Sequence, residues 1–87
     1  MIKQNLKELQ TIPGIGKAMA ENLYNLGYRR VSDLKNEAPN KMYYYLCKLD
    51  GFRLDPCVMY TFKCAVYFAT ESQHDPELLK WWNWKDK

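Results

Sequence analysis

The sequence contains no long hydrophobic run, and no part of its 87 residues approaches the ~18 consecutive apolar residues of a transmembrane helix. Its first ten residues, MIKQNLKELQ, also lack the apolar core of a signal peptide, so we expect a cytoplasmic location and no membrane partner. Hydrophobic residues still make up 47% of the chain, which indicates a folded domain rather than a disordered segment. A chain of this length is expected to form one domain, residues 1–87.

Cysteine and histidine are scarce, with three and one residues respectively. Cys47, Cys57 and Cys64 form no C-x-x-C pair, so neither a disulfide framework nor a zinc site is predicted, and we interpret them as small buried hydrophobic residues. The lone histidine, His74, lies in the polar stretch ESQHDP and is interpreted as a solvated loop residue. Because no base accompanies a nucleophile, the chain is predicted not to be an enzyme, with no side-chain metal site and no required cofactor.

Signals for β-hairpins are missing as well, since no Asn-Gly or Asp-Gly pair joins two alternating segments. Pro39, Pro56 and Pro76 instead stand where the first turn of a helix would begin. The predicted fold class is therefore all-α, a compact bundle of about five short helices. The expected helices cover residues 5–10, 17–26, 39–49, 56–70 and 76–82.

Glycine is rare too, yet two of the four glycines lie in the stretch TIPGIGKA at residues 11–18, which we call the glycine turn. Asn5, with Glu8 three residues later, is expected to cap a short helix before this turn. An amphipathic helix follows the turn, and Gly27 is expected to end it in a left-handed conformation. Residues 5–27 are thus predicted to form two helices joined by the glycine turn.

The glycine turn has the composition of a phosphate site. Gly14 and Gly16 allow another molecule to approach the backbone closely. They precede a helix start, where unpaired N–H groups and the positive end of the helix dipole favour an oxyanion. Lys17 adds a full positive charge there. The alternative is that the two glycines only allow two helices to pack closely, and we favour the phosphate site.

The pattern L-x-x-I-P-G-I-G-K-x-x-A-x-x-L-x-x-L-G, read from Leu9 to Gly27, resembles the helix-hairpin-helix motifs of DNA-binding proteins. This resemblance implies that the turn contacts DNA phosphates through backbone amides, without regard to base sequence. The implied contact residues are Gly14, Ile15, Gly16, Lys17 and Ala18. Such hairpins can also hold a potassium or sodium ion on main-chain carbonyls, which here would be those of Gln10, Ile12 and Ile15.

A second, degenerate helical hairpin is expected at residues 39–70, because its turn LDGFRLD retains Gly51 alone. Paired hairpins of this kind bind both strands of a duplex. One complete hairpin therefore implies weak DNA binding, with an affinity that falls as the salt concentration rises. Residues 47–69, followed by DPELLKWWNWKD, resemble small bacterial proteins of the pathogenicity-locus family. That resemblance implies a single helix-hairpin-helix domain and no defined activity.

Positive charge is concentrated in the part of the chain that holds the glycine turn. The net charge is +3, and residues 1–36 carry six basic and three acidic side chains. Residues 71–87, in contrast, carry three basic and four acidic side chains. An anionic partner is therefore expected near the turn. The candidate flanking phosphate contacts are Arg29, Arg30 and Lys35.

Aromatic residues gather in two segments. Three consecutive tyrosines at residues 43–45 span most of a helical turn, so at least one ring must face away from the core. Trp81, Trp82 and Trp84 crowd the C-terminus, where exposed rings could stack on unpaired bases or contact a protein. We favour a third interpretation, in which the last helix folds back over the core and leaves Trp84 the most exposed.

The predicted function is non-enzymatic, sequence-independent nucleic-acid binding, with DNA as the expected partner. The alternative is a protein-interaction module that uses Trp81, Trp82 and Trp84, and a small enzyme is the third. Asp33 follows the hairpin as an aspartate does in DNA glycosylases, but this chain is too short for the second lobe that encloses a flipped base. We interpret Asp33 as a first-turn acid of a brief helical turn.

Overall fold

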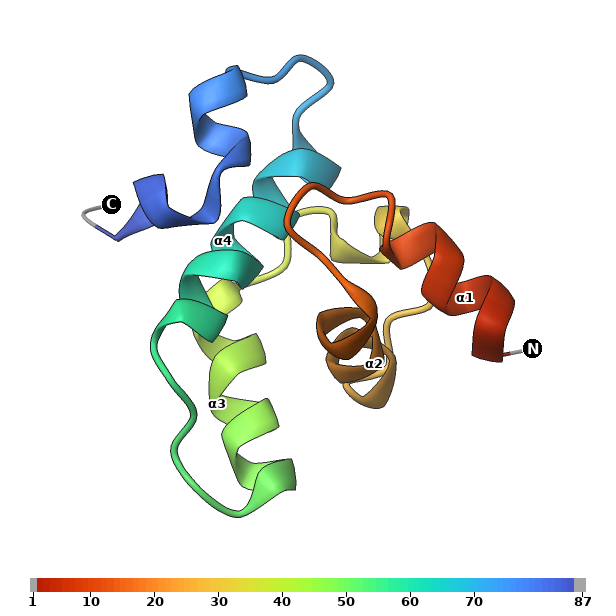
Figure 1. The fold of residues 1–87 in the computed structure, drawn as a ribbon, viewed down its shortest axis with the longest axis vertical. Coiled ribbons are helices and arrows are strands. Elements are labelled where there is room, and N and C mark those ends of the chain that lie inside the picture. Colours follow the sequence, from red (N-terminus) through yellow and green to blue (C-terminus); the bar gives the residue numbers. More distant parts are fainter. Residues whose placement is uncertain (1, 86–87) are drawn as a thin grey trace.

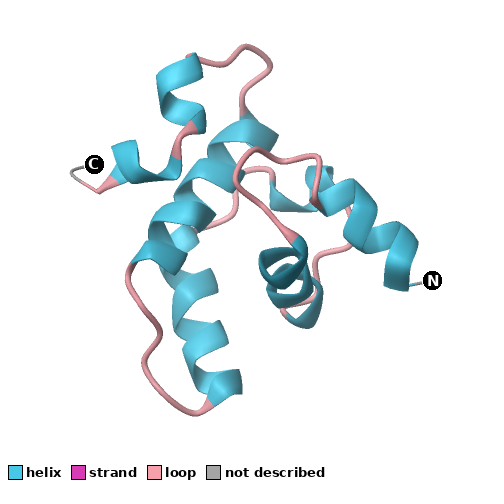
Figure 2. Cartoon of the chain, in the orientation of Figure 1, coloured by secondary structure: helices cyan, strands magenta, loops and turns pink. Residues whose placement is uncertain are grey.

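The fold consists of four α-helices and three 3-10 helices, in a computed structural model that describes residues 2–85, with side chains described from Leu6 onward. The α-helices are α1 (Ile2–Leu9), α2 (Lys17–Asn25), α3 (Pro39–Asp50) and α4 (Cys57–Thr70). The 3-10 helices are η1 (Val31–Leu34), η2 (Pro76–Leu79) and η3 (Trp81–Trp84). No β-strand occurs in this described range, as Figure 2 shows, so the all-α prediction is confirmed.

Helix α4 is the central element of the fold. In Figure 1 it crosses the middle of the molecule, with α1 and α2 on one side and the C-terminal 3-10 helices on the other. It packs against α3, η1, η2 and η3, while α1 packs against α2. The α4 sequence CVMYTFKCAVYFAT is apolar on nearly every side, so this helix is stable only where other elements cover it.

The hydrophobic core joins two helix pairs, α1 with α2 and α3 with α4. Phe62 and Ala65 of α4 are fully buried and belong to one cluster with residues of both pairs. The other buried members of that cluster are Leu6, Leu9, Ile12, Ile15, Ala20, Leu23, Leu34, Met42 and Leu46. Each helical hairpin therefore buries the apolar face of the other.

Several helix ends follow the caps that the sequence predicts. Asp55 accepts a hydrogen bond from the Cys57 N–H at 2.9 Å at the start of α4. Gly51 ends α3 with a φ of +78°, and Gly27 follows α2 with a φ of +102°. These left-handed positions explain why glycine stands at each of these two ends.

The predicted start of the first helix is wrong, because α1 begins at Ile2 rather than at Asn5. The residues between these two positions contain no helix breaker, so the helix extends over them. The Asn5 side chain itself lies outside the described residues. Glu8, expected to face Asn5, instead accepts a hydrogen bond from the Val31 N–H at 2.8 Å. This bond fixes the start of η1 beside α1.

The predicted C-terminal α-helix is replaced by the two 3-10 helices η2 and η3. Asp75 caps the first of them as expected, accepting from the Glu77 N–H at 3.0 Å. An α-helix would pair the Glu77 and Leu78 carbonyls with N–H groups four residues later. Here the Asn83 side chain donates to the Glu77 carbonyl at 2.7 Å, and the Trp84 indole donates to the Leu78 carbonyl at 2.8 Å. Side-chain donors thus occupy the two backbone carbonyls that an α-helix would pair with backbone N–H groups.

His74 is packed into the fold, which corrects its interpretation as a solvated residue. Its Nε2 lies 2.9 Å from the Phe68 carbonyl oxygen, and its half-buried ring stacks on Phe68 with centroids 4.8 Å apart. The apolar end of α4 provides this surface. Cys64 is buried as expected, and burial raises the pKa of its thiol to about 11, whereas Cys47 and Cys57 are half-buried.

Phe62→Ala is expected to lower the free energy of unfolding by about 3–5 kcal/mol, because removing a fully buried ring leaves a cavity in the core. Urea titration followed by circular dichroism measures the loss, and Phe62→Leu gives a smaller loss should the alanine variant fail to fold. Phe52→Ala is the matched control, since that ring is 63% exposed and its removal should cost less than about 0.5 kcal/mol. Equal losses at the two positions would contradict the central place of α4.

Candidate nucleic-acid interface

The glycine turn closes with a β-turn over residues 12–15. The Ile15 N–H donates to the Ile12 carbonyl at 3.1 Å, and Pro13 and Gly14 occupy the two central positions. Gly14 has a φ of +83°, the left-handed value that the second central position of a type II turn requires. Pro13 suits the position before it, because its ring holds φ at a negative value. The Pro-Gly pair therefore fixes this turn locally.

Two buried isoleucines anchor the turn and leave its backbone at the surface. Ile12 and Ile15 are buried, whereas Gly14 and Gly16 are exposed. Within the described part of the chain, the N–H groups of Gly14, Gly16 and Ala18 have no hydrogen-bond acceptor. Because Gly16 is the N-cap of α2, these donors lie at the positive end of the helix dipole.

Lys17 and Ile15 are the other two predicted contact residues of the turn. Lys17 offers a charged side chain, whereas the backbone N–H groups of both residues already have acceptors. Lys17 opens α2 with an exposed side chain. The Gln10 side-chain amide is oriented so that its nitrogen donates to the Leu6 carbonyl at 3.2 Å. The amide oxygen then accepts a hydrogen bond from the Lys17 N–H, also at 3.2 Å. The Ile15 N–H is used within the β-turn. The site thus offers three backbone donors and one ammonium group, from Gly14, Gly16, Ala18 and Lys17.

The carbonyls proposed for a potassium or sodium ion are those of Gln10, Ile12 and Ile15. The Ile12 carbonyl already accepts the Ile15 N–H across the β-turn. A carbonyl oxygen has a second lone pair, so this hydrogen bond does not by itself prevent cation binding. The ion stays a prediction from the sequence.

Arg29, one of the predicted flanking cations, is turned inward. Its Nη1 donates to the Tyr24 carbonyl at 2.8 Å, and its guanidinium lies 3.7 Å from the centroid of the Tyr24 ring. The positive charge therefore stabilises the C-terminal end of α2, which helical rise places roughly 13 Å from the start of that helix. Its role in this structure is to cap α2.

Arg30, the second predicted flanking cation, lies in the segment that adjoins the end of α1. Its side chain is exposed, and the hydrogen bond between Val31 and Glu8 holds the adjoining backbone beside the end of α1. Asp33 accepts from the Arg30 N–H at 3.0 Å, which supports its interpretation as a structural acid of η1. Lys35 is exposed as well, and no contact among the described residues ties it to the turn.

The C-terminal segment reaches the glycine turn, although the two are far apart in sequence. A Cβ atom placed on Gly14 would lie 3.7 Å from Cδ1 of Trp81, so the Trp81 ring covers one side of this glycine. Trp82 meets Trp81 edge to face, with ring centroids 5.8 Å apart, and is 51% exposed. The Lys85 ammonium lies 6.0 Å from the Trp81 centroid. Sequence reasoning missed this proximity because no local pattern links the two segments.

Trp84 is not the exposed tryptophan, which corrects the prediction. It is half-buried, and its ring lies against Tyr67 with centroids 5.6 Å apart. A 3-10 helix has three residues per turn, so Trp81 and Trp84 lie on the same side of η3 while Trp82 points elsewhere. The C-terminal segment does fold back against α4, as predicted.

Comparison with known proteins identifies the family. The family described as pathogenicity locus matches residues 2–87. The chain belongs to the pathogenicity locus family. Mitomycin resistance protein McrB of Streptomyces lavendulae is 26% identical over 84 residues, which cover 97% of this chain and 76% of that protein. No solved structure shows significant similarity to the chain.

Among the described residues we looked for two other features, a metal site and a membrane-spanning helix. No group of three or more His, Cys, Asp or Glu side chains among these residues is arranged to hold a metal ion. None of the described helices has the length and apolar character needed to cross a membrane. The most distinctive chemistry on this surface is therefore the row of unpaired N–H groups at the glycine turn.

Gly14→Ala is expected to lower the free energy of unfolding by about 1–2 kcal/mol, because alanine is strained at the left-handed φ of +83°. Gly16→Ala is the matched control, since its φ of −90° suits alanine and no atom lies within 4 Å of the added Cβ. That variant should stay within about 1 kcal/mol of the parent. Urea denaturation compares the two, and a larger loss at Gly16 would contradict the turn geometry.

Proposed function

We propose that this chain is a non-enzymatic nucleic-acid-binding module of the helix-hairpin-helix type, which binds phosphates without regard to base sequence. One observation carries the proposal: the N–H groups of Gly14, Gly16 and Ala18 are unpaired at the start of α2, beside the exposed Lys17 side chain. A phosphate oxygen satisfies such donors, and the helix dipole adds to the attraction. Backbone donors reach phosphate rather than base edges, so they carry no sequence information.

The second helical hairpin lacks this arrangement, which supports binding through one turn only. Gly51 ends α3 and its N–H donates to the Cys47 carbonyl at 2.9 Å, so it is not a free donor. At the start of α4, the Asp55 carboxylate accepts the Cys57 N–H. The hydrogen bonds from Cys57 lower the pKa of the Asp55 carboxyl, which keeps it charged. A negative charge at that helix start repels phosphate.

The C-terminal aromatic residues extend the proposed interface toward unpaired bases. Trp81 packs beside Gly14, and the exposed Trp82 ring follows it directly. A base adjoining a phosphate on the turn could stack on Trp82, because base stacking on aromatic rings tolerates any base. The Lys85 ammonium, 6.0 Å from the Trp81 centroid, adds a cation beside these rings. We therefore expect single-stranded DNA, or the frayed end of a duplex, to bind better than an intact duplex.

Lys17→Ala is expected to weaken DNA binding about fivefold at low salt and to reduce the slope of log K against log salt by about one. Fluorescence anisotropy with labelled single-stranded and duplex DNA, from about 50 mM to about 200 mM salt, measures both effects. For the parent chain, two or three phosphate contacts give a slope of about −2 to −3.

Lys48→Ala is the matched control for that titration, because it removes the same charge from α3, away from the turn. Arg30→Ala tests the flanking cation and should have a smaller effect than Lys17→Ala. The proposal is overturned if, at low salt and a protein concentration on the order of tens of micromolar, the parent chain binds neither single-stranded nor duplex DNA. Equal weakening by Lys17→Ala and Lys48→Ala would show that overall charge, rather than the turn, attracts DNA.

Trp82→Ala is expected to weaken the binding of single-stranded DNA about fivefold or more, since one base stacked on an aromatic ring contributes about 1–3 kcal/mol of binding free energy. Its effect on intact duplex should be small, because paired bases are not available for stacking. Tyr44→Ala controls for loss of an exposed ring, since Tyr44 is 55% exposed and lies on α3. An identical loss for single-stranded and duplex DNA would contradict stacking at Trp82.

A further inference from the structure

Exposed apolar side chains are concentrated on the outer face of α3. Among the described residues, four of the five exposed large apolar side chains lie on this helix or the turn after it: Tyr44, Tyr45, Leu49 and Phe52. Tyr45 and Leu49 are four residues apart and lie on one stripe of α3, whereas Phe52 follows the left-handed Gly51 that ends the helix. The buried Met42 lies three residues before Tyr45 and seven before Leu49, so it is next to them on the helix, and with Leu46 it forms the part of α3 that the core covers. The apolar surface of α3 therefore continues from the buried Met42 to the exposed Tyr45 and Leu49.

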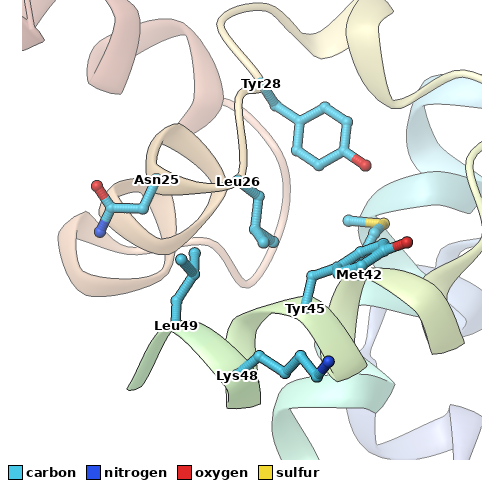
Figure 3. A pocket seen from close by; sticks show the side chains of 7 residues that line it. All are labelled: Asn25, Leu26, Tyr28, Met42, Tyr45, Lys48 and Leu49. Atoms are coloured by element: carbon cyan, nitrogen blue, oxygen red, sulfur yellow. The ribbon is translucent and has the colours of Figure 1, made fainter. Parts of the chain in front are cut away.

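A cavity of about 310 Å³, which we call the α3 groove, adjoins this stripe. It is lined by Asn25, Leu26, Tyr28, Met42, Tyr45, Lys48 and Leu49. Figure 3 shows the Leu26 and Tyr28 side chains, at the end of α2, directed toward those of α3. The groove is open because α2 packs with α1 while α3 packs with α4, so the outer parts of α2 and α3 are not closed together. Its size suits one large apolar side chain of a partner.

The positive charge of α3 beside the groove favours a partner that carries negative charge. Lys41 and Lys48 lie on the same face as Tyr45, at spacings of four and three residues, and both are exposed. No carboxylate lies on this face, since Asp50 is directed to a different side of the helix. At the other end, Glu37 accepts the Tyr28 hydroxyl at 2.9 Å. The apolar stripe is thus flanked by positive charge along α3.

We propose that the α3 groove binds an acidic amphipathic helix of a protein partner. That helix places an apolar side chain between Leu26 and Leu49 and its flanking carboxylates opposite Lys41 and Lys48. An apolar groove lined by Leu26, Tyr45 and Leu49 is the kind of surface that the helix-in-groove mode of recognition uses. This site is separate from the glycine turn and does not depend on nucleic-acid binding.

A second copy of this chain suits the groove less well. In a two-fold symmetric contact along α3 the same helix face meets itself, so Lys41 and Lys48 of one copy would face those of the other, while Glu37 lies at the Tyr28 end of the groove. Like charges brought together in this way disfavour association. Carboxylates on a different protein remove that repulsion and supply the attraction.

The experiment is a selection of peptides on the full chain. A displayed library of amphipathic helices about four turns long varies the stripe residues and their flanking charges. We expect enrichment of peptides with Leu, Phe or Trp on the stripe and Glu or Asp beside it. The affinity of an enriched peptide, measured by anisotropy, should fall about tenfold with Leu49→Ala and with Lys48→Glu.

Two variants serve as controls in that assay. Trp82→Ala removes an exposed ring outside the groove, and Lys17→Ala removes a lysine at the glycine turn, so both should bind the peptide like the parent chain. Circular dichroism verifies that each variant is folded. The proposal is overturned if no peptide is enriched, if the enriched peptides are basic, or if Leu49→Ala binds them unchanged. It is also overturned if sedimentation shows a dimer that Leu49→Ala dissociates, since a second copy would then fill the groove.

Discussion

Helix α4 presents an apolar surface on nearly every side, and the other elements are arranged so that water is excluded from it. Helix α3, η1 and the C-terminal 3-10 helices cover it directly. The α1–α2 pair closes the core through residues such as Ile12 and Leu23. Even His74 takes part, because its ring stacks on Phe68 near the end of α4. A domain of this size has little other apolar surface to bury, so covering α4 decides where each segment lies.

The candidate phosphate site is a by-product of the same burial. Ile12 and Ile15 enter the core on either side of the Pro-Gly pair, which forces the intervening backbone to the surface. The N–H groups of Gly14, Gly16 and Ala18 then have no acceptor within the described chain. At the start of α4 the equivalent position is filled by the Asp55 carboxylate. The two helical hairpins therefore share a shape but differ in the charge that they present at their second helix.

The molecule carries two surfaces with different chemistry. The glycine turn, with Lys17 and with Trp81 packed beside Gly14, is the surface proposed for an anionic chain with unpaired bases. The α3 groove, with Leu49 and Lys48, suits an acidic helix. Because Lys17 lies at the start of α2 and Leu49 lies on α3, each proposed surface can be changed without altering the other.

Features that depend only on neighbouring residues could be predicted from the order of amino acids alone. Prolines and caps give α3 and α4, and Pro13 with Gly14 gives the turn, because backbone sterics and local hydrogen bonds act over a few residues. Which cations face solvent depends on the folded arrangement, since Arg29 turns inward to the Tyr24 carbonyl and ring. The folded arrangement also replaced the C-terminal α-helix by two 3-10 helices and brought Trp81 to Gly14. Contacts between distant segments compete with local preference there, and burial against α4 prevails.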